Sequence, residues 1–404
     1  MDRPMEIIQP NKVTKLYDQL NRIFYLFGLK SYWISELGIS DRFLSFYRRI
    51  YEPINNILNI YFPISILGSF LTQKNLSEQQ AAERLKYGVM FPCHWVFYLI
   101  LLFYKAQVRE LLYCLAVVLR QHYNDPELEV ELVKKIKMYN MTLTSLVVVE
   151  CICSGLKALF GMITAGENFI TCITVWPDVN DNSIPAGVMR VIIYVCWYTF
   201  TTRILTTFCL LITMMLSVCY QFKNLQSYFY HLDDIFEDES LSQDEKERKY
   251  EEAFKLGIQM HSLSLWCKKQ HQRICQGIFT WEIIIFFGMF MVQLTTLLRS
   301  HNNSTTELVT TAMRSMTTLL ALGFFMCSGG DITVEALKLS EAIYSSGWQN
   351  CYGKSALRIR KLVVGALRQA QEPVLYKTLG VVEFSYEAYV SIVKMPYTAL
   401  SVLY

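Results

Sequence analysis

The sequence predicts an all-α membrane protein with seven transmembrane helices, a cytosolic N-terminus, an extracellular C-terminus and a cytosolic helical anchor domain. Three observations predict this class: seven apolar runs of membrane length, no strand-like alternation within them, and an excess of Lys and Arg on one side. Of the 404 residues, 52% are hydrophobic and 18% are charged. This composition excludes a disordered chain, a small disulfide scaffold and a basic nucleic-acid-binding domain.

The apolar runs are the primary signal. Most of them reach the ~20 residues that a helix needs to cross ~30 Å of hydrocarbon. Backbone groups in hydrocarbon are satisfied only in helices and closed barrels, and the runs lack the alternation of barrel strands. A soluble domain buries one or two such segments, so seven argue against that class. The expected spans are residues 51–72, 87–104, 141–163, 191–220, 277–298, 308–327 and 386–404.

The positive residues orient these spans. If the N-terminus is cytosolic, the inner segments hold 29 Lys and Arg, whereas the outer segments hold 5. This asymmetry predicts a cytosolic N-terminus, and an odd number of spans then places the C-terminus outside. No apolar leader follows the first residues, so no cleavable signal is expected. Residues 16–29 predict an amphipathic helix, lying at the cytosolic interface or packed on the bundle.

Glycosylation sequons give a separate check on this topology. Asn75 follows the first span, and Asn302 and Asn303 lie between the fifth and sixth spans. All three are therefore expected on the outer side and are candidate glycosylation sites. Asn140 also begins a sequon, but it lies at an inner boundary and is expected to be unmodified.

Motifs for catalysis and metal binding are absent from the sequence. The 12 Cys and 6 His form no metal-ligand spacing, and there is no nucleotide-binding loop or nucleophile elbow. Most cysteines are expected to behave as small apolar residues. The sequence therefore predicts a protein that is not an enzyme and that needs no metal or cofactor.

A charged residue within a span costs free energy, so it is a candidate functional residue, although a structural role is the simpler interpretation. Glu150 and Arg203, in the middle of spans three and four, are expected to be able to pair. Arg314 could snorkel outward from span six. Lys157 lies near an outer boundary, and Glu282 lies near an inner one.

The outer halves of spans two and four are rich in aromatic residues. Such residues line an apolar cavity open to the outside, or they serve helix packing and an interfacial aromatic belt. We treat outer-half residues of spans two to five as candidate ligand-binding positions. They are Phe91, His94, Trp95, Ser154, Trp197, Tyr198 and Gln293.

Two stretches near the C-terminus carry a recognisable pattern: FFMCSGGDITVEALKLSEAIYSSGWQN at 324–350, and RKLVVGALRQAQEPVLYKTLGVVEFSYEAYVSIVKMPYTALSVLY at 360–404. Weaker patterns are ITVWPD at 173–178 and FKNLQSYFYHL at 222–232. In these stretches, and in length, span number and orientation, the chain resembles the insect odorant receptors. The wider family, including gustatory receptors, ends in TY, five apolar residues and QF. Tyr397 matches this ending, whereas Pro396 and Leu403 depart from it.

The resemblance implies an odorant-sensing subunit of a ligand-gated, nonselective cation channel. In that family four subunits surround one pore, cytosolic helices join the subunits, and the odorant binds among the outer halves of the spans. Tuning subunits assemble with a longer co-receptor, whose inserted inner loop this chain lacks. The implied partners are this co-receptor in a heterotetramer, a small volatile odorant and membrane lipid, with no nucleic acid. The implied location is the plasma membrane of a sensory neuron dendrite.

The resemblance also places the pore on the last span. The family's apolar gate falls at Leu400, where a ring of apolar side chains can dewet a narrow pore. Val393 lies seven residues earlier on nearly the same face, whereas Lys394 lies roughly 120° from Leu400 and avoids the pore. The candidate pore and gate residues are Val393, Tyr397, Leu400, Ser401 and Tyr404.

Three regions follow from this interpretation: residues 1–328 with six spans and the ligand site, 329–384 as the cytosolic anchor, and 385–404 as the pore helix. Two alternatives stay open. One is a gustatory-type channel of the same fold, which works without a co-receptor. The other is a seven-helix metabotropic receptor, whose C-terminus lies in the cytosol.

Overall fold

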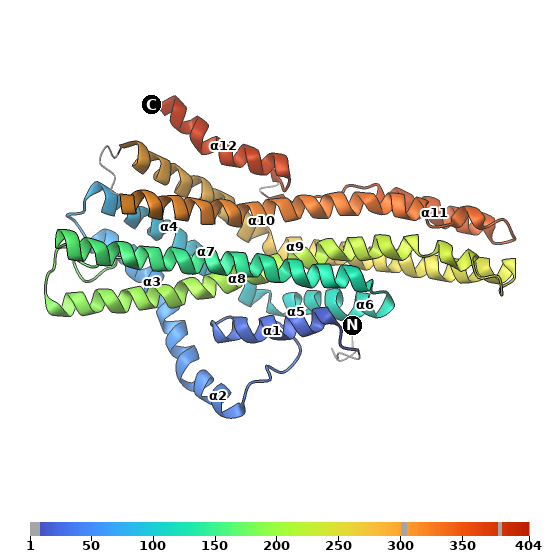
Figure 1. Ribbon diagram of the computed structural model, residues 1–404, viewed down its shortest axis with the longest axis horizontal. Helices are drawn as coiled ribbons and strands as arrows, with labels where there is room; N and C mark the ends of the chain where they lie inside the picture. The colour runs from blue at the N-terminus through green and yellow to red at the C-terminus, as the bar shows by residue number, and fades with distance from the viewer. Residues whose placement is uncertain (1–8, 300–304, 379–381, 404) are drawn as a thin grey trace.

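The computed structural model describes residues 9–299, 305–378 and 382–403, which form an elongated bundle of helices (Figure 1). In its first half, the elements are α1 Lys12–Leu26, α2 Asp41–Phe46, the π-helical turn η1 Tyr47–Tyr51, α3 Glu52–Thr72, α4 Glu78–Phe103, α5 Lys105–Tyr113, the π-helical turn η2 Cys114–Val118, α6 Leu119–His122 and α7 Pro126–Ala165. The remaining elements are α8 Ile184–Tyr230, η3 Asp233–Phe236, α9 Gln243–Arg299, α10 Thr305–Tyr344, η4 Trp348–Asn350, α11 Ala356–Ala370, β1 Lys377–Thr378, β2 Val382–Glu383 and α12 Tyr386–Leu403.

Six helices of the described chain are long and apolar enough to cross a membrane. They are the continuous helix over 41–72, then α4, α7, α8, α9 and α10. These contain the first six expected spans, so the apolar runs predicted them correctly. The seventh run forms α12, an 18-residue helix that carries Glu387 and Lys394 and is not among the six.

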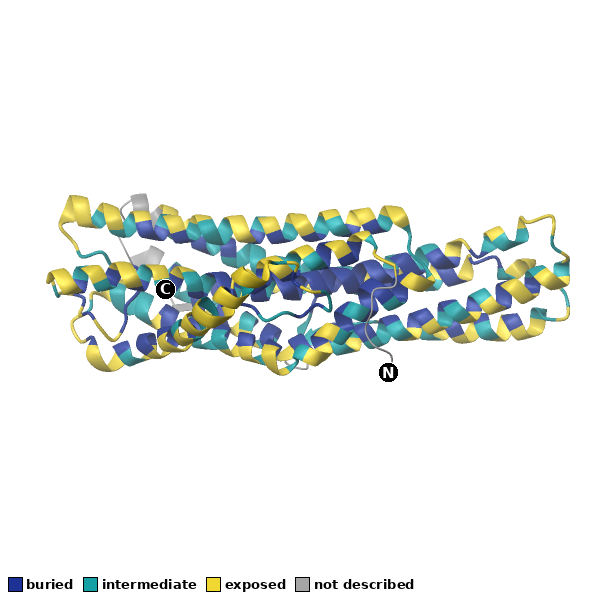
Figure 2. Cartoon of the chain, turned by 90° about the horizontal axis from the view of Figure 1, so that it is seen from below, coloured by how far each residue is buried: buried dark blue, intermediate teal, exposed yellow. Residues whose placement is uncertain are grey.

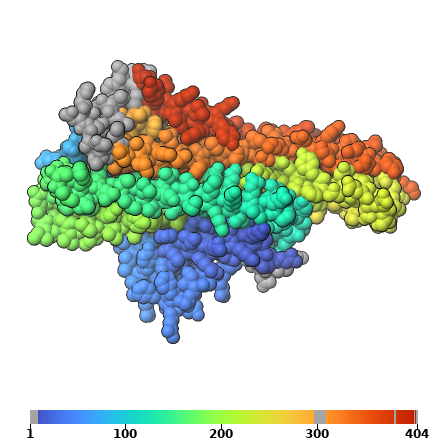
Figure 3. Space-filling view, in the orientation of Figure 1, coloured from blue at the N-terminus to red at the C-terminus, as the bar shows by residue number. Residues whose placement is uncertain are grey.

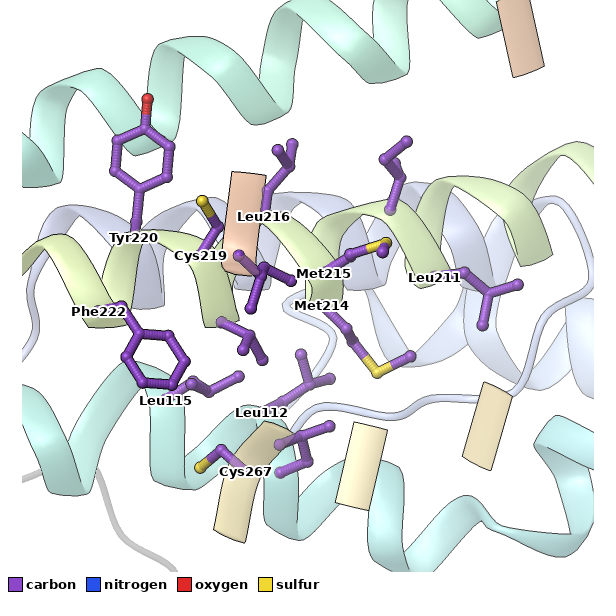
Figure 4. Packing of buried hydrophobic residues seen from close by; sticks show 14 of the residues in the cluster. Leu112, Leu115, Leu211, Met214, Met215, Leu216, Cys219, Tyr220, Phe222 and Cys267 are labelled. Atoms are coloured by element: carbon purple, nitrogen blue, oxygen red, sulfur yellow. The ribbon is translucent and has the colours of Figure 1, made fainter. Parts of the chain in front are cut away.

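Helix α8 is the centre of the bundle. Its most apolar stretch is 89% buried, because α7, α9 and α10 pack around it. A helix that is apolar on all sides needs such an environment. Leu211, Met214, Met215 and Leu216 are completely buried there, and they meet side chains from other helices in one continuous core (Figure 4). Figure 2 shows this buried centre, with exposed residues on the outer faces of the surrounding helices.

Helix α1 packs on the bundle. Asn11 caps its first turn, since the Asn11 side chain accepts a hydrogen bond from the Thr14 backbone N–H. Leu16 and Tyr17 enter the main core, and the Tyr17 hydroxyl lies 2.5 Å from the Ser217 hydroxyl of α8. Of the two interpretations of this amphipathic segment, the packed helix is the one observed.

Connecting segments lie at both ends of the bundle (Figure 1). Residues 73–77 and 166–183 lie at one end, whereas α11 and the turn between α8 and α9 lie at the other. Helix α7 begins at Pro126, with the Asp125 side chain as its cap, and ends at Gly166 with a φ of 65°. Gln73, which follows α3, holds the loop over 166–183, because its amide donates to the carbonyls of Thr174 and Pro177, at 3.0 Å each.

The spans continue into the anchor region as single helices. Helix α8 has 47 residues, α9 has 57 and α10 has 40, so each extends well beyond its apolar run. The expected boundary between 328 and 329 lies inside α10. Helix α11 packs on these extensions, and Arg358 reaches Glu251 of α9. The residues after 328, which were expected to form a separate anchor, thus begin within the same helix as the sixth apolar run.

A short hairpin leads into α12. Strands β1 and β2 pair antiparallel, with Lys377 opposite Glu383 and Thr378 opposite Val382. The next residue, Phe384, packs against Gly329 of α10, where an added Cβ would lie 2.6 Å from the Phe384 Cβ. Glycine is needed for this close approach. From this point α12 packs against both α9 and α10, and α10 and α12 are visible on one side of the molecule (Figure 3).

Candidate ligand cavity

A cavity of about 140 Å³ lies among α4, α7, α8, α9 and α10. An apolar cavity of ~150 Å³ accommodates benzene, so this space suits a small organic molecule. Most of its wall is apolar, and it also contains Lys86, His94, Glu150, Glu282 and Arg314. The lining residues used below are Lys86, Tyr87, Phe91, His94, Glu150, Trp197, Thr201, Glu282, Arg314, Thr317, Thr318 and Ala321.

Three of the seven candidate ligand-binding residues line this cavity: Phe91, His94 and Trp197. The other four do not. Trp95 follows His94 on α4 and turns away from the cavity, and Tyr198 is 37% exposed on α8. Consecutive residues on a helix point in directions about 100° apart. The position of a residue along a span therefore does not reveal whether its side chain faces the cavity.

Ser154 and Gln293 lie behind the cavity wall. The Ser154 hydroxyl accepts a hydrogen bond from Arg314 at 3.2 Å, and Arg314 itself lines the cavity. Gln293 accepts a hydrogen bond from the Ser315 hydroxyl at 2.7 Å and lines a second, smaller void of about 40 Å³. Lys86 and Arg314 border both spaces, so they separate the smaller void from the cavity.

Aromatic side chains form a rigid wall on the α4 side. Tyr87 and Phe91, four residues apart, stack with their ring centres 5.0 Å apart. Phe91 meets Phe200 of α8 edge-on at 5.2 Å, and Tyr87 lies 6.4 Å from Trp197. All four rings are buried. This wall holds the shape of the cavity without a bound molecule.

A buried ionic cluster closes one part of the cavity. Arg314 is 8% exposed and lies 3.6 Å from Glu83 of α4 and 3.8 Å from Glu150 of α7. Lys157 also reaches Glu83, at 3.6 Å. The expectation that Arg314 snorkels outward was wrong: the charge is stabilised inside the bundle because two carboxylates from neighbouring helices face it.

The expected pairing of Glu150 with Arg203 was also wrong. Arg203 donates to the Asn56 side chain of α3 at 2.9 Å and lies over the Tyr98 ring at 4.8 Å. Helix α8 turns Arg203 toward α3 and α4, whereas Glu150 of α7 faces α10. The sequence could not reveal which helices are neighbours at each level.

A second polar pair lies further along α4. His94 Nε2 lies 3.6 Å from Glu282 Oε2 of α9, and both side chains are largely buried. The cavity therefore has ionisable residues that were not among the ligand candidates: Lys86, Glu150, Glu282 and Arg314. The sequence feature that could have identified them is an ionisable residue inside or beside an apolar run. For such residues a structural role was the simpler interpretation.

The pore and gate candidates lie on α12, apart from this cavity. Val393 is half-buried and packs on the main core, whereas Tyr397 is 71% exposed and Ser401 is exposed. Leu400 belongs to α12 by its backbone, but its side chain lies outside what the structure describes, as does the whole of Tyr404.

The sequons fall on different surroundings. Asn75 is exposed in the loop between α3 and α4. Asn302 and Asn303 lie outside the described residues. Asn140 is buried and donates to the Thr213 hydroxyl at 3.2 Å, so it has no room for a glycan in this fold.

Helix α12 is tied to α10 at two levels. The Tyr389 hydroxyl donates to the Leu319 carbonyl at 3.1 Å. At the base of α12, the Tyr386 hydroxyl donates to Asp331 of α10, and Lys135 of α7 lies 3.4 Å from the same carboxylate. Leu319 lies between cavity-lining residues of α10, so one helix contacts both the cavity and α12.

The family model of the 7tm odorant receptors matches residues 94–397, which is more than half of the chain. The chain therefore belongs to the odorant receptor family, a family of multi-pass membrane receptors and not of enzymes. No curated protein matches the sequence. Among the described residues, no group of three His, Cys, Asp or Glu side chains could hold a metal ion, and all twelve cysteines are free.

Solved structures with the same fold include the insect olfactory receptor OR5 from Machilis hrabei, at 13% identity and a TM-score of 0.74 over 96% of both chains. The structure of that receptor in complex with eugenol matches with 14% identity and a TM-score of 0.75 over 97% of both chains. The chain is thus similar in fold to an insect olfactory receptor along almost its entire length.

Proposed function

We propose that this chain is the odorant-sensing subunit of a heteromeric, ligand-gated, nonselective cation channel. The observation that carries the proposal is the mostly apolar cavity among five helices of an odorant receptor fold. The related receptor binds eugenol, a small molecule, and the cavity described above suits a ligand of similar kind. Burying roughly 200–300 Å² of such a ligand at ~25 cal/mol per Å² stabilises the bound state by a few kcal/mol.

Helix α10 supports a route from the ligand to α12. Thr317, Thr318 and Ala321 line the cavity, and the Leu319 carbonyl between them accepts the hydrogen bond from Tyr389 of α12. A ligand that fits the cavity better when α10 has shifted would favour that arrangement. The shift would then reach α12 through Tyr389.

Helix α12 is the proposed pore helix. Its exposed residues include Val390, Met395 and Tyr397, which leaves one face without a partner within the described chain. We assign this face to the pore axis and to the neighbouring subunits of a tetramer. Leu400 would form the apolar gate with Val393 and Tyr397 nearby, and Ser401 and Tyr404 would add polar groups.

The proposed assembly contains the co-receptor, with residues 329–384 as the cytosolic anchor. The N-terminus would be cytosolic and the C-terminus outside, with Asn75, Asn302 and Asn303 accessible to glycosylation. The proposed location is the plasma membrane of sensory neuron dendrites. The excess of Lys and Arg in the inner segments supports this orientation.

The test is co-expression with an odorant receptor co-receptor and exposure to a panel of volatiles. We expect an inward cation current with a suitable volatile and little current from this chain alone. Leu400→Ala should change the resting or evoked current without changing the order of odorant preference. Surface expression without current across a broad panel would contradict the proposal.

The side of the C-terminus is tested separately. An epitope tag after the last residue should stain without permeabilisation. Staining only after permeabilisation would instead favour the metabotropic topology, in which the C-terminus is cytosolic.

A further inference from the structure

Two buried hydrogen-bond donors in the cavity wall have no acceptor within the described residues. Tyr87 is 2% exposed and Trp197 is 3% exposed, and neither the Tyr87 hydroxyl nor the Trp197 indole N–H has a hydrogen-bond partner in the described structure. Both residues line the cavity, and their ring centres are 6.4 Å apart. A buried donor without an acceptor costs ~1–3 kcal/mol, so this arrangement needs an explanation.

Lys86 adds a third donor at the same level. It is 7% exposed, lines the cavity and precedes Tyr87, whose ring centre lies 5.5 Å from its nitrogen. Lys86 forms no ion pair with any carboxylate of the described residues, although Arg314 beside it faces both Glu83 and Glu150. An amine donates hydrogen bonds whether it is charged or neutral.

No acceptor that lines the cavity is hydrogen-bonded to the Tyr87 hydroxyl or to the Trp197 indole N–H. Glu150 faces Arg314 at 3.8 Å. Glu282 lies 3.6 Å from His94, and its Oε2 accepts no hydrogen bond within the described residues. The hydroxyls of three lining threonines donate to backbone carbonyls of their own helices; these are Thr201, Thr317 and Thr318. An acceptor atom from outside the chain would supply the partner that Tyr87 and Trp197 lack.

We propose that the ligand of this cavity is a small volatile with an apolar body and one acceptor oxygen, such as the carbonyl of a ketone or ester. The oxygen lies against Lys86, Tyr87 and Trp197, and the body extends along α4 past Phe91 toward His94. Lys86 and His94 are eight residues apart, which is ~12 Å along a helix. This inference rests on the proposed role of the cavity as the odorant site, and it names the chemical class of the odorant.

The proposal predicts discrimination between two molecules of equal size. Acetophenone and isopropylbenzene have the same number of heavy atoms, but only acetophenone has an acceptor oxygen. A site with buried donors disfavours the analogue that cannot satisfy them. A hydrogen bond to an ionisable group is worth ~1.5–3 kcal/mol, so acetophenone should bind roughly ten- to a hundredfold more tightly.

The experiment measures the dissociation constants of both probes for the purified full chain by tryptophan fluorescence. Trp197 lines the cavity, so its emission should respond to a bound probe. Lys86→Met removes the amine and keeps a side chain of similar length. We expect acetophenone to lose most of its advantage in this variant, while binding of isopropylbenzene stays within about threefold of the original. Lys86→Arg keeps a donor and should retain the preference.

The matched control is Tyr194→Phe. The Tyr194 hydroxyl donates to the Cys151 carbonyl, and Tyr194 does not line the cavity, so its removal should leave the ratio of the two constants unchanged. Tyr87→Phe removes one hydroxyl from the cavity itself and should narrow the ratio. If Lys86→Met does not yield folded protein, Tyr87→Phe and Lys86→Arg together decide the outcome.

Equal affinity of the original chain for both probes would overturn the proposal. A tightly held water that already satisfied the donors would give this result. An unchanged ratio in Lys86→Met and Tyr87→Phe would also overturn it. Discriminating binding without any odorant-evoked current in the assembled complex would contradict the proposed channel function and leave the ligand class standing. Current evoked equally by both probes would support the proposed channel function and contradict the proposed ligand class.

Discussion

Replacing Arg314 by methionine should destabilise the folded chain more than the loss of any other single charge around the cavity. The guanidinium is 8% exposed and faces Glu83 at 3.6 Å and Glu150 at 3.8 Å. Without it, both carboxylates would remain in a low-dielectric environment, where Lys157 still pairs with Glu83 at 3.6 Å and Glu150 has no ion-pair partner among the described residues. Such a loss costs ~3–5 kcal/mol for a fully buried pair.

The magnitude follows from the exposure of the two carboxylates. Glu83 and Glu150 are 26% and 24% exposed at their side chains, so water reduces the penalty, and we expect about 2–4 kcal/mol for Arg314→Met. The assay is the melting temperature of the detergent-solubilised full chain, followed by the loss of its monodisperse chromatographic peak. The decrease should amount to several degrees.

Two further variants make this prediction specific. Neutralising the carboxylates with Glu83→Gln and Glu150→Gln in the Arg314→Met background should restore at least half of the lost stability. Lys157→Met removes a pair whose two side chains are each 26% exposed and should cost ~1 kcal/mol or less. Equal melting temperatures of Arg314→Met and Lys157→Met would refute this explanation. A variant with both carboxylates neutralised that melts no higher than Arg314→Met would refute it as well.

Two other predictions concern the attachment of α12. Gly329→Ala should destabilise the chain by ~1–3 kcal/mol, because the new methyl group would lie 2.6 Å from Phe384; Gly187→Ala, with no atom within 4 Å, is the control, and equal melting temperatures would contradict the packing argument. Tyr389→Phe removes the hydrogen bond to the Leu319 carbonyl and should shift the odorant concentration for half-maximal current by a few-fold while leaving direct ligand binding unchanged. An unaltered current–concentration curve would show that this contact does not transmit the signal.

The spans could be predicted from the sequence because they depend on local composition. A run such as 191–220 is apolar on every side, and this requires either lipid or a surrounding of other helices; the central position of α8 satisfies that requirement. The extension of α8 after its apolar run and that of α9 before its run were also predictable, because neither segment contains a proline to end the helix.

The cavity was only partly predictable. Phe91, His94 and Trp197 line it, and they were chosen by position and side-chain type. The rotation of each helix decides the rest, and it depends on which helices are neighbours. Arg314 lies beside Glu150 because α10 packs on α7, a pairing that is absent from the linear sequence.

Lys86 shows why the polar part of the cavity was missed. It lies just before the apolar run of span two, where an interfacial lysine is ordinary. Its burial results from α4, α7, α9 and α10 meeting around it, as the residues lining the two voids show. No property of residue 86 alone distinguishes a snorkelling lysine from one that lines a cavity.

The central claim is that α12 lines a cation pathway that an odorant opens. The most direct measurement is the odorant-evoked current of Ser401→Cys, co-expressed with the co-receptor, before and after exposure to a small, positively charged thiol reagent. Ser401 is exposed on α12, whereas most native cysteines are buried, and the unmodified chain serves as the control. The account predicts block of the current in Ser401→Cys alone. Labelling of the introduced cysteine at residue 401 without a decrease of the odorant-evoked current would contradict it.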